Sequence, residues 1–418
     1  MRGGDTTGLR AYNERLMIAT IRQAGALSKA EIARTTGLSG QAATVIVNSL
    51  LDEGLLVKRE KVRGRVGKPF TPIALNPEGA YSIGVKIGRR SLEVLLVDFG
   101  GAVVASRSTP YPAPLPAETM DLATRTAMEL MGSLKRGSRA RIVGLGVAMP
   151  WVLHEWSDVL GLEREAIAAW REIDVAAELE SATGLPVSVY NDATAACAAE
   201  MIAGDRIVRS SALYIYLGTF VGGGVVIGGH LYRGEQVNAG ALGSMPMVER
   251  GGDGSPHQLI HEASVIDLER ALTAAGFEVS EMFDPHGTPD ADDVFDAWMR
   301  RAVEGLARAV VSAMSVVDFE EVVIDGLLRP DWRRRVVDGV TSAYGRFDCT
   351  GLSPIEIATG SIGPQARVLG AALLPLIGRF SPDTDLLVKT AKISKSVDRK
   401  PAIDPGMSGT STVSDETT

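Results

Sequence analysis

Apolar residues recur at helical spacing in three short blocks near the start of the chain, and a glycine follows each block. The first block predicts a helix over residues 9–24, with inward positions Leu16, Ile18, Ile21 and Ala24. The second begins at a capping box of Ser28 and Glu31 and ends before Gly37. The third begins at Ser39 and ends at Gly54, with inward positions Ala43, Val47, Leu50 and Leu51. The short turn between the last two blocks predicts a helix-turn-helix.

Two further segments after the third helix predict a β-hairpin. They cover residues 55–60 and 70–75, and the loop from Lys61 to Pro69 joins them with four basic residues and two glycines. A hairpin in this position is typical of a winged helix. Its basic loop can follow DNA phosphates or enter a minor groove. A plain helical hairpin followed by a solvated turn is the alternative interpretation.

The outward side chains of the third helix are short and polar, which lets a helix approach base edges in a major groove. The charge distribution also indicates DNA binding by this part of the chain. Residues 1–80 carry 12 Lys and Arg against 7 Asp and Glu, whereas the whole chain has a net charge of −8. The predicted partner is double-stranded operator DNA. Its predicted contacts are Ser39, Gln41, Thr44, Asn48, Arg63, Arg65 and Lys68.

The remaining chain alternates predicted strands and helices, which is typical of an α/β protein. One series has strands at 81–88, 92–98, 102–106, 142–148 and 187–190, with helices near 117–135 and 174–183. A second series starts with a strand at 212–217, a glycine-dense turn at 222–224 and a strand at 225–229. Two such series predict a body of two lobes.

Length and composition narrow the class of protein. A chain of 418 residues is long enough for two to three domains. No uncharged apolar run reaches the roughly 18 residues that cross a bilayer, so we expect a soluble, cytoplasmic protein with no membrane partner. Two cysteines exclude a disulfide framework and an all-cysteine zinc site. Residues 389–418 are rich in Ser, Thr and Gly and predict a disordered tail.

Several ordered motifs resemble those of the ROK family (repressor, ORF, kinase), which comprises sugar kinases and sugar-responsive repressors. The matching motifs are residues 144–150, 190–200, 217–224, 231–234 with 239–240, 324–326 and 363–372. The resemblance spans nearly residues 9–385. It implies a two-lobed actin/hexokinase-like body of the ribonuclease H-like ATPase fold, with sugar at the floor of the cleft and, in the kinases, ATP above it. A winged helix joined to this body resembles the transcriptional-regulator branch.

Pattern and resemblance together predict the domain organisation. A winged helix-turn-helix DNA-binding domain covers residues 1–80, and lobe 1 covers residues 81–200. Lobe 2 covers residues 201–388, and its C-terminal helix returns to lobe 1. The disordered tail follows at 389–418. The body is expected to join copies of the chain into a homodimer or homotetramer.

The resemblance also indicates that kinase chemistry is degenerate. Asp192 matches the catalytic base of the family, but the first phosphate turn, with an aspartate and glycines in the family, here runs from Lys86 to Ser91. A lysine cannot hold a Mg²⁺ shell. The further departures are Phe220, Ala241, Ser244 and Asp325. We therefore expect no enzyme, no cofactor and no metal site, with Asp192 a relic base. An active ATP-dependent sugar kinase with a DNA-binding appendage is the alternative.

The sugar floor of the family is partly retained. Asn191, Asp192 and Glu262 match hydroxyl ligands and are the predicted effector-binding residues. Trp151 and Trp156 either stack on a sugar or fill the pocket, and we favour filling. The sequence thus predicts a sequence-specific transcriptional regulator, a repressor of sugar uptake or catabolism genes, controlled by a small sugar or sugar-phosphate effector. A constitutive DNA-binding protein without an effector is a third possibility.

Overall fold

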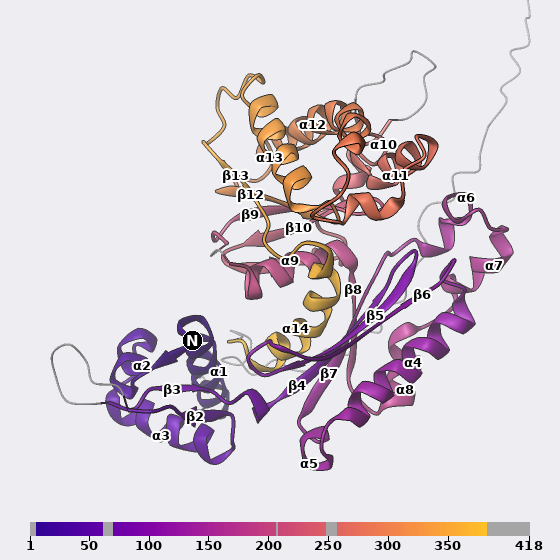
Figure 1. The fold of residues 1–418 in the computed structure, drawn as a ribbon. Coiled ribbons are helices and arrows are strands. Elements are labelled where there is room, and N and C mark those ends of the chain that lie inside the picture. Colours follow the sequence, from indigo (N-terminus) through magenta and orange to yellow (C-terminus); the bar gives the residue numbers. More distant parts are fainter. Residues whose placement is uncertain (1–5, 62–69, 206–207, 248–256, 383–418) are drawn as a thin grey trace, which may run out of the picture.

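The computed structural model describes residues 6–61, 70–205, 208–247 and 257–382. A small N-terminal part lies beside the first of two α/β lobes, and the second lobe lies above it in the view of Figure 1. Among the helices of these described residues, none has both the length and the apolar character that a membrane span requires.

The N-terminal part has three helices and a three-stranded sheet in which β3 is central. Its elements are α1 (Thr6–Ala24), β1 (Ala26–Leu27), α2 (Lys29–Thr36), α3 (Gly40–Asp52), β2 (Leu56–Lys58) and β3 (Ile73–Leu75). The capping box at Ser28 and Glu31 is present, and Ser39 caps α3 by accepting a hydrogen bond from the amide of Ala42. The winged helix-turn-helix fold is therefore confirmed.

The buried face of α1 differs from the prediction. Met17, Ile18 and Ile21 are buried, whereas Leu16 is half-buried and Ala24 is exposed. Residues 17 and 21 lie one helical turn apart, so Met17 shares the face of Ile21 that packs on the core. In α3 the prediction missed Ile46, which is buried one turn before Leu50, while Leu51 is half-buried and packs against the same core.

Each lobe is built on a five-stranded sheet, and the strand order is equivalent in both: β6-β5-β4-β7-β8 and β11-β10-β9-β12-β13. The first three strands of each lobe pair antiparallel, and the other two pair parallel. This repeated arrangement confirms the ribonuclease H-like body. The strands of lobe 1 are β4 (Tyr81–Ile87), β5 (Ser91–Asp98), β6 (Val103–Pro110), β7 (Ile142–Met149) and β8 (Val187–Asn191). Those of lobe 2 are β9 (Ala212–Leu217), β10 (Val221–Ile227), β11 (His230–Tyr232), β12 (Glu321–Gly326) and β13 (Glu356–Thr359).

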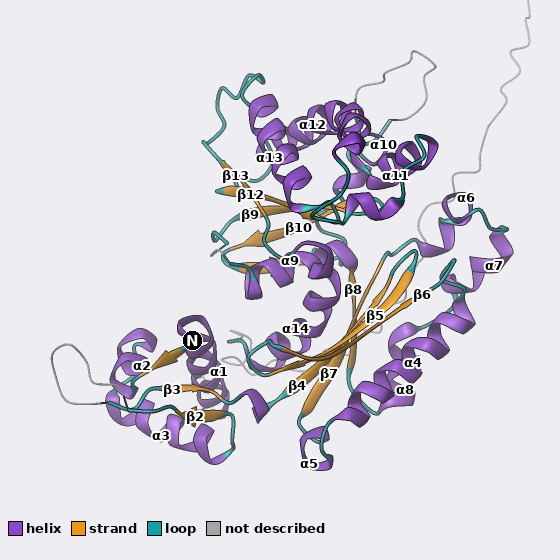
Figure 2. Cartoon of the chain, viewed as in Figure 1, coloured by secondary structure: helices purple, strands orange, loops and turns teal. Residues whose placement is uncertain are grey.

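Helices cover both sheets and fill the space between them (Figure 2). On lobe 1 lie α4 (Pro116–Ser133), α5 (Arg136–Arg139), α6 (Ser157–Leu160), α7 (Arg164–Ala168) and α8 (Val175–Thr183). On lobe 2 lie α10 (Ile260–Ala263), α11 (Val265–Ala274), α12 (Asp292–Met314) and α13 (Pro330–Tyr344). Helices α9 (Asp192–Ala203) and α14 (Ala366–Phe380) pack on each other between the two sheets.

The glycine-dense stretch predicted as a turn is instead the middle of strand β10. A Cβ atom on Gly222 would lie 2.9 Å from the Cβ of Ala193, and one on Gly224 would lie 2.4 Å from the Cβ of Cys197. Helix α9 therefore packs on β10 so closely that side chains do not fit there. The glycines serve helix-to-sheet packing and not chain reversal.

The backbone of helix α14 lies in direct contact with the backbones of its neighbours. A Cβ atom on Gly370 would lie 1.7 Å from the carbonyl oxygen of Ala195 in α9. A Cβ atom on Gly146 in β7 would lie 2.1 Å from the carbonyl oxygen of Ala371. Glycine on either side of the contact is thus what lets α14 lie against both α9 and the lobe 1 sheet.

The other half of α14 contacts the winged helix. Leu373 and Leu376 belong to one apolar cluster with Met17 and Ile21 of α1. The ring of Phe380 at the end of α14 lies 4.6 Å from that of Phe99, centroid to centroid. Because these apolar groups are shared, the winged helix and α14 are packed as one unit at this point.

Gly370→Ala tests the close packing of α14. We expect it to lower the free energy of unfolding by about 1–3 kcal/mol, because overpacking outweighs the better helix propensity of alanine. Gly378→Ala in the same helix is the matched control, since no described atom lies within 4 Å of the added carbon. The control should be neutral or stabilise by up to about 1 kcal/mol. Urea unfolding measures both, and equal effects would contradict the packing.

Candidate functional site

Helix α3 presents an exposed face that carries two of the seven predicted DNA contacts. Gln41 and Asn48 are exposed and lie two helical turns apart on this face. Asn48 Oδ1 accepts a hydrogen bond of 2.7 Å from Lys29 Nζ at the start of α2. The structure thus brings Gln41 and Asn48 together on the surface, with a cation beside them.

Two of the predicted contacts hold the helix itself. The Ser39 hydroxyl accepts the amide of Ala42 at 3.2 Å, and Thr44 Oγ1 donates to the carbonyl oxygen of Gly40 at 2.7 Å. Thr44 is half-buried. Arg63, Arg65 and Lys68 lie outside the described residues.

Sequence reasoning missed Val45 and Lys29 on this surface. Val45 is 60% exposed between Gln41 and Asn48, and an apolar side chain there can contact a thymine methyl group. The signal was present in the helical period, since Val45 lies one turn after Gln41 and off the inward face. Lys29 follows the capping serine of α2, and its proximity to Asn48 required the tertiary structure.

A cavity of about 360 Å³ lies between the lobes and holds two of the three predicted effector residues. Asn191 and Asp192 line it at the start of α9, where the Asn191 side chain caps the helix by accepting the amide of Ala193. The family departures Phe220, Ala241 and Ser244 line it too.

Asp192 is ion-paired across the base of this cavity. Arg367 Nη1, from the first turn of α14, lies 3.3 Å from Asp192 Oδ2, and both residues line the cavity. Burial alone would lower the pKa of Arg367, but Tyr216, Asp192 and Glu93 raise it overall, so this cation stays charged. The Asp192 carboxylate therefore already has a cationic partner inside the cavity.

Glu262, the third predicted effector residue, lies apart from Asn191 and Asp192. Its side chain is buried, and Oε1 lies 3.2 Å from Nε2 of His257. It packs against α12, where a Cβ atom on Gly305 would lie 2.2 Å from Glu262 Oε2. Glu262 is not among the residues that line the cavity around Asp192.

The two tryptophans take different places. Trp156 is buried in the lobe 1 core and packs edge-on against Phe220, with ring centroids 4.9 Å apart. Trp151 lines the cavity, and its indole Nε1 donates to the carbonyl oxygen of Val237 at 3.3 Å. Val237 has a φ of 51°, a strained conformation for a β-branched residue. Trp156 thus belongs to the lobe 1 core and also lines the cavity, while Trp151 bridges from lobe 1 to lobe 2 over it.

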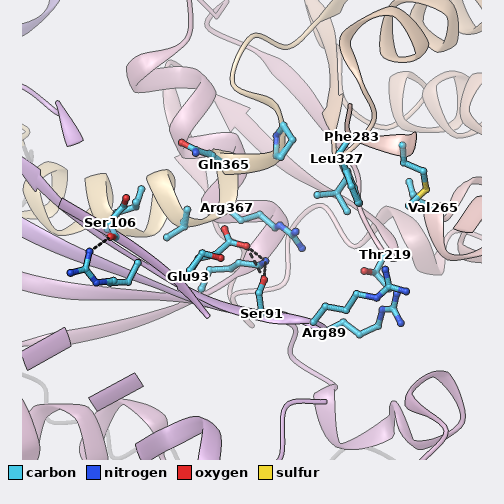
Figure 3. Close-up of a pocket in the computed structure, with 18 of the residues that line it drawn as sticks. Arg89, Ser91, Glu93, Ser106, Thr219, Val265, Phe283, Leu327, Gln365 and Arg367 are labelled. Atoms are coloured by element: carbon cyan, nitrogen blue, oxygen red, sulfur yellow. Dashed lines mark hydrogen bonds and ion pairs between the residues drawn. The ribbon is translucent and has the colours of Figure 1, made fainter. Parts of the chain in front are cut away.

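A second cavity of about 430 Å³ adjoins the first and shares Arg89, Thr219 and Arg367 with it (Figure 3). Five basic and two acidic side chains line it: Lys86, Arg89, Arg90, Arg107, Arg367, Glu93 and Glu269. It lies where the resemblance puts the phosphate turn of the kinases, at the turn between β4 and β5. Lys86, Arg89 and Arg90 of this turn all line the cavity.

Lys86 is the most deeply buried cation of that turn. Its Nζ lies 2.6 Å from Glu93 Oε1 and 3.3 Å from Ser91 Oγ. Burial, with repulsion from Arg367, lowers the pKa of Lys86 to about 8. Burial opposes ionisation of Glu93, but Lys86 outweighs it and holds the pKa of that carboxyl below its usual value.

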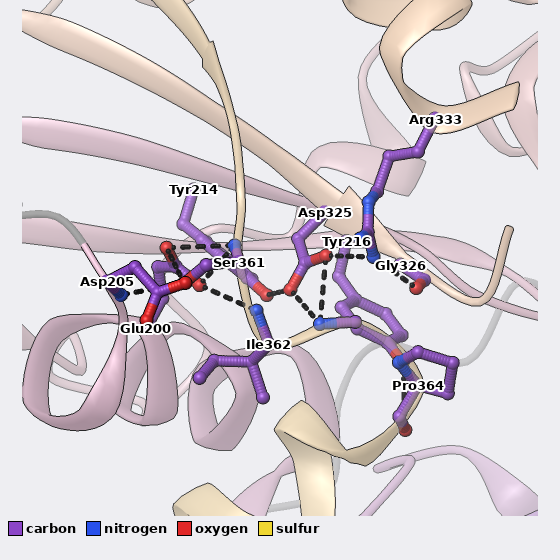
Figure 4. Close-up of polar contacts among 11 residues, drawn as sticks. Glu200, Asp205, Tyr214, Tyr216, Asp325, Gly326, Arg333, Ser361, Ile362 and Pro364 are labelled. Atoms are coloured by element: carbon purple, nitrogen blue, oxygen red, sulfur yellow. Dashed lines mark hydrogen bonds and ion pairs between the residues drawn. The ribbon is translucent and has the colours of Figure 1, made fainter. Parts of the chain in front are cut away.

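Asp325, one of the departures from the family motifs, lines neither of these two cavities. It is fully buried and accepts hydrogen bonds from Arg333 Nη1 at 2.7 Å, from the Tyr214 hydroxyl at 3.0 Å and from the amide of Gly363 (Figure 4). Beside it, Glu200 of α9 accepts the amide and the hydroxyl of Ser361. Together these carboxylates fix the loop that leads into α14.

Metal ligation finds no support in these side chains. Within the ranges that the structure describes, no group of three or more His, Cys, Asp or Glu residues is placed to hold an ion.

Comparison with known proteins places both parts of the chain. The ROK family model matches residues 82–376, and a MarR family model matches residues 14–65. The "Uncharacterized protein y4fQ" of Sinorhizobium fredii is 28% identical over 88% of this chain and 92% of its own. The "Xylose repressor" of Bacillus subtilis is 23% identical over 58% of this chain and 62% of its own.

A solved structure shares the fold over most of the chain. It is that of a ROK family transcriptional regulator described as a homolog of the E. coli MLC protein, with a TM-score of 0.61 and 20% sequence identity. The alignment covers 89% of this chain and 99% of that one, so the winged helix and the body are both included.

Lys86→Met tests the electrostatics of the turn. Between pH 8 and the usual lysine pKa of 10.5 the unfolded chain binds more protons than the folded chain, so wild-type stability rises through this window. The charge penalty is fully present below pH 8. Relative to the variant, wild type should gain up to about 3 kcal/mol of unfolding free energy as pH rises through the window.

Urea unfolding of both proteins at pH 7, 9 and 10.5 measures this difference. A difference that does not change with pH would contradict the burial of a charged Lys86.

Proposed function

This chain belongs to the ROK family and carries the winged helix-turn-helix DNA-binding domain of its transcriptional regulators, and we propose that it represses sugar uptake or catabolism genes under the control of a small sugar-like effector. The winged helix binds operator DNA. The effector binds in the interlobe cavity at Asn191 and Asp192, and no phosphoryl transfer takes place there.

The observation that carries this proposal is the double contact of α14. Arg367 in its first turn is paired with Asp192 in the cavity, and Leu376 near its other end packs against α1. A ligand that changes the Asp192–Arg367 pair therefore acts on the helix that supports the DNA-binding domain. Because the protein interior is close-packed, a shift at one end of a buried helix also moves the residues that pack on its other end.

The alternative, an active sugar kinase, fits the cavity chemistry less well. Asp192 is held by Arg367, and Lys86 with Glu93 occupies the turn where a kinase needs a metal-binding carboxylate. The Bacillus subtilis relative is named a xylose repressor, and this name supports a sugar-responsive repressor rather than a sugar kinase.

Gln41→Ala tests the operator surface. Loss of a base contact should weaken binding to a selected operator by about 1–3 kcal/mol and leave binding to random DNA nearly unchanged. Gln23→Ala at the exposed end of α1 is the matched control and should bind both duplexes as wild type does. Fluorescence anisotropy with an operator selected from random duplexes measures the affinities. An equal loss on both duplexes would contradict base readout by α3.

Arg65→Ala separates phosphate contacts from base contacts. It should weaken operator and random DNA alike and reduce the slope of log affinity against log salt by about one. Titrations from low to physiological salt measure the slope, and a slope equal to that of wild type would remove Arg65 from the interface.

Asp192→Asn tests effector control. The amide keeps a hydrogen-bond acceptor for Arg367 but loses the charge, so operator affinity without effector should stay within about twofold, while the expected 5- to 150-fold effector response should disappear. Asp121→Asn, an exposed carboxylate on α4, is the control. A panel of hexoses and pentoses is added to the operator titration. A normal response of the variant, or sugar-dependent ADP release by wild type with Mg²⁺ and ATP, would contradict the proposal.

A further inference from the structure

The second interlobe cavity is lined by more positive charge than its own carboxylates neutralise. Of its five basic side chains, Lys86 is paired with Glu93, and Arg107 reaches Glu129 outside the cavity. Arg367 is paired with Asp192, and Arg89 and Arg90 share the single carboxylate of Glu269. One positive charge around this space of about 430 Å³ therefore has no carboxylate of its own among the described residues. Concentrated positive charge in a partly closed space attracts small anions.

Two of these guanidinium groups have buried hydrogen-bond donors without acceptors. Nε of Arg89 and Nε of Arg367 are buried and have no hydrogen-bond partner among the described residues. The Arg367 residue is only 7% exposed. A buried donor without an acceptor is costly, and an acceptor that enters the cavity removes the cost.

The carboxylate of Glu269 occupies the position beside Arg89 and Arg90 that a bound anion would take. It lies on α11 in lobe 2 and pairs with both Arg89 and Arg90 in the β4–β5 turn of lobe 1. One carboxylate thus serves two guanidinium groups and holds the two lobes together. Figure 3 shows Arg89 and Arg367 converging on the same space from different elements.

We propose that this cavity binds the phosphate group of a small phosphorylated ligand, and that the phosphate takes the place of Glu269 between Arg89 and Arg90. A phosphate dianion offers three acceptor oxygens, and planar guanidinium groups match it in pairs. Arg367 lines both cavities, so a phosphorylated sugar can place its phosphate here and its hydroxyl groups beside Asp192. The chemical class of the effector is therefore a sugar phosphate.

Phosphate binding would also change the contact between the two lobes. Once Arg89 and Arg90 bind phosphate, Glu269 is released and the lobe-to-lobe ion pair is lost. This step links ligand binding to the arrangement of the lobes, and it rests on the proposed function. The binding of the phosphate itself does not.

Isothermal titration calorimetry on the full chain tests the binding without DNA. The probes are inorganic phosphate and a panel of phosphorylated hexoses and pentoses, each beside its unphosphorylated sugar, at constant ionic strength. At least one phosphorylated sugar should bind tenfold or more tightly than its parent, and inorganic phosphate should compete with it. Binding by the unphosphorylated sugars alone would overturn the proposal, as would silence of the whole panel.

Three variants make the test stricter, because the proposal predicts weaker binding of the phosphorylated sugar for two of them and tighter binding for the third. Arg89→Gln and Arg90→Gln should each weaken the phosphorylated sugar roughly 10- to 100-fold. Glu269→Gln should tighten it by about threefold or more, since a competing carboxylate is removed. Arg125→Gln on α4, which also removes one arginine charge from an ion pair, is the control and should bind as wild type does.

The outcomes separate this proposal from the proposed function. A Glu269→Gln variant that binds more weakly, or Mg²⁺-dependent ATP binding that the arginine variants abolish, would overturn the phosphate site. Operator release by an unphosphorylated sugar together with silent phosphate titrations would overturn this inference and leave effector control standing. Phosphate binding without any operator binding would support this site and contradict the regulator.

Discussion

The backbone of helix α14 lies against α9 and the lobe 1 sheet with no room for side chains at the contact. Glycines on both sides, Gly370 in the helix and Gly146 in β7, make that approach possible. From this position the helix brings Arg367 to the cavity at one end and Leu376 to the winged helix at the other. The loop before it is fixed by the buried carboxylates of Glu200 and Asp325. The interlobe cavity, lobe 1 and the winged helix therefore all contact the same helix.

Buried ion pairs occupy the floor of the cleft between the lobes. Lys86 and Glu93 form one pair at the turn between β4 and β5, and Arg367 and Asp192 form another at the start of α9. These pairs are internally neutral, so they occupy the catalytic positions without leaving an isolated buried charge. Arg89 and Arg90 of the turn share one carboxylate, that of Glu269 in lobe 2, so the second cavity carries one more positive charge than its ion pairs neutralise.

Local signals predicted much of the fold, and long-range contacts account for the rest. The capping box, terminal glycines and strand periods located the winged helix and most strands, because each depends on neighbours in sequence. The glycines of β10 were misinterpreted, since the reason for them is α9, whose residues come some thirty positions earlier. In the same way, Asp192 was recognised by motif, but its partner Arg367 and the burial of Asp325 depend on segments far apart in the chain.

The central claim is that α14 carries the state of the cavity to the winged helix. Hydrogen–deuterium exchange of the full chain, with and without the tightest-binding sugar or sugar phosphate of the panels, tests it most directly. The account predicts altered protection in the cavity residues, along α14 and in the amides of α1 that pack on it. Altered protection confined to the cavity, with α14 and α1 unchanged, would contradict it.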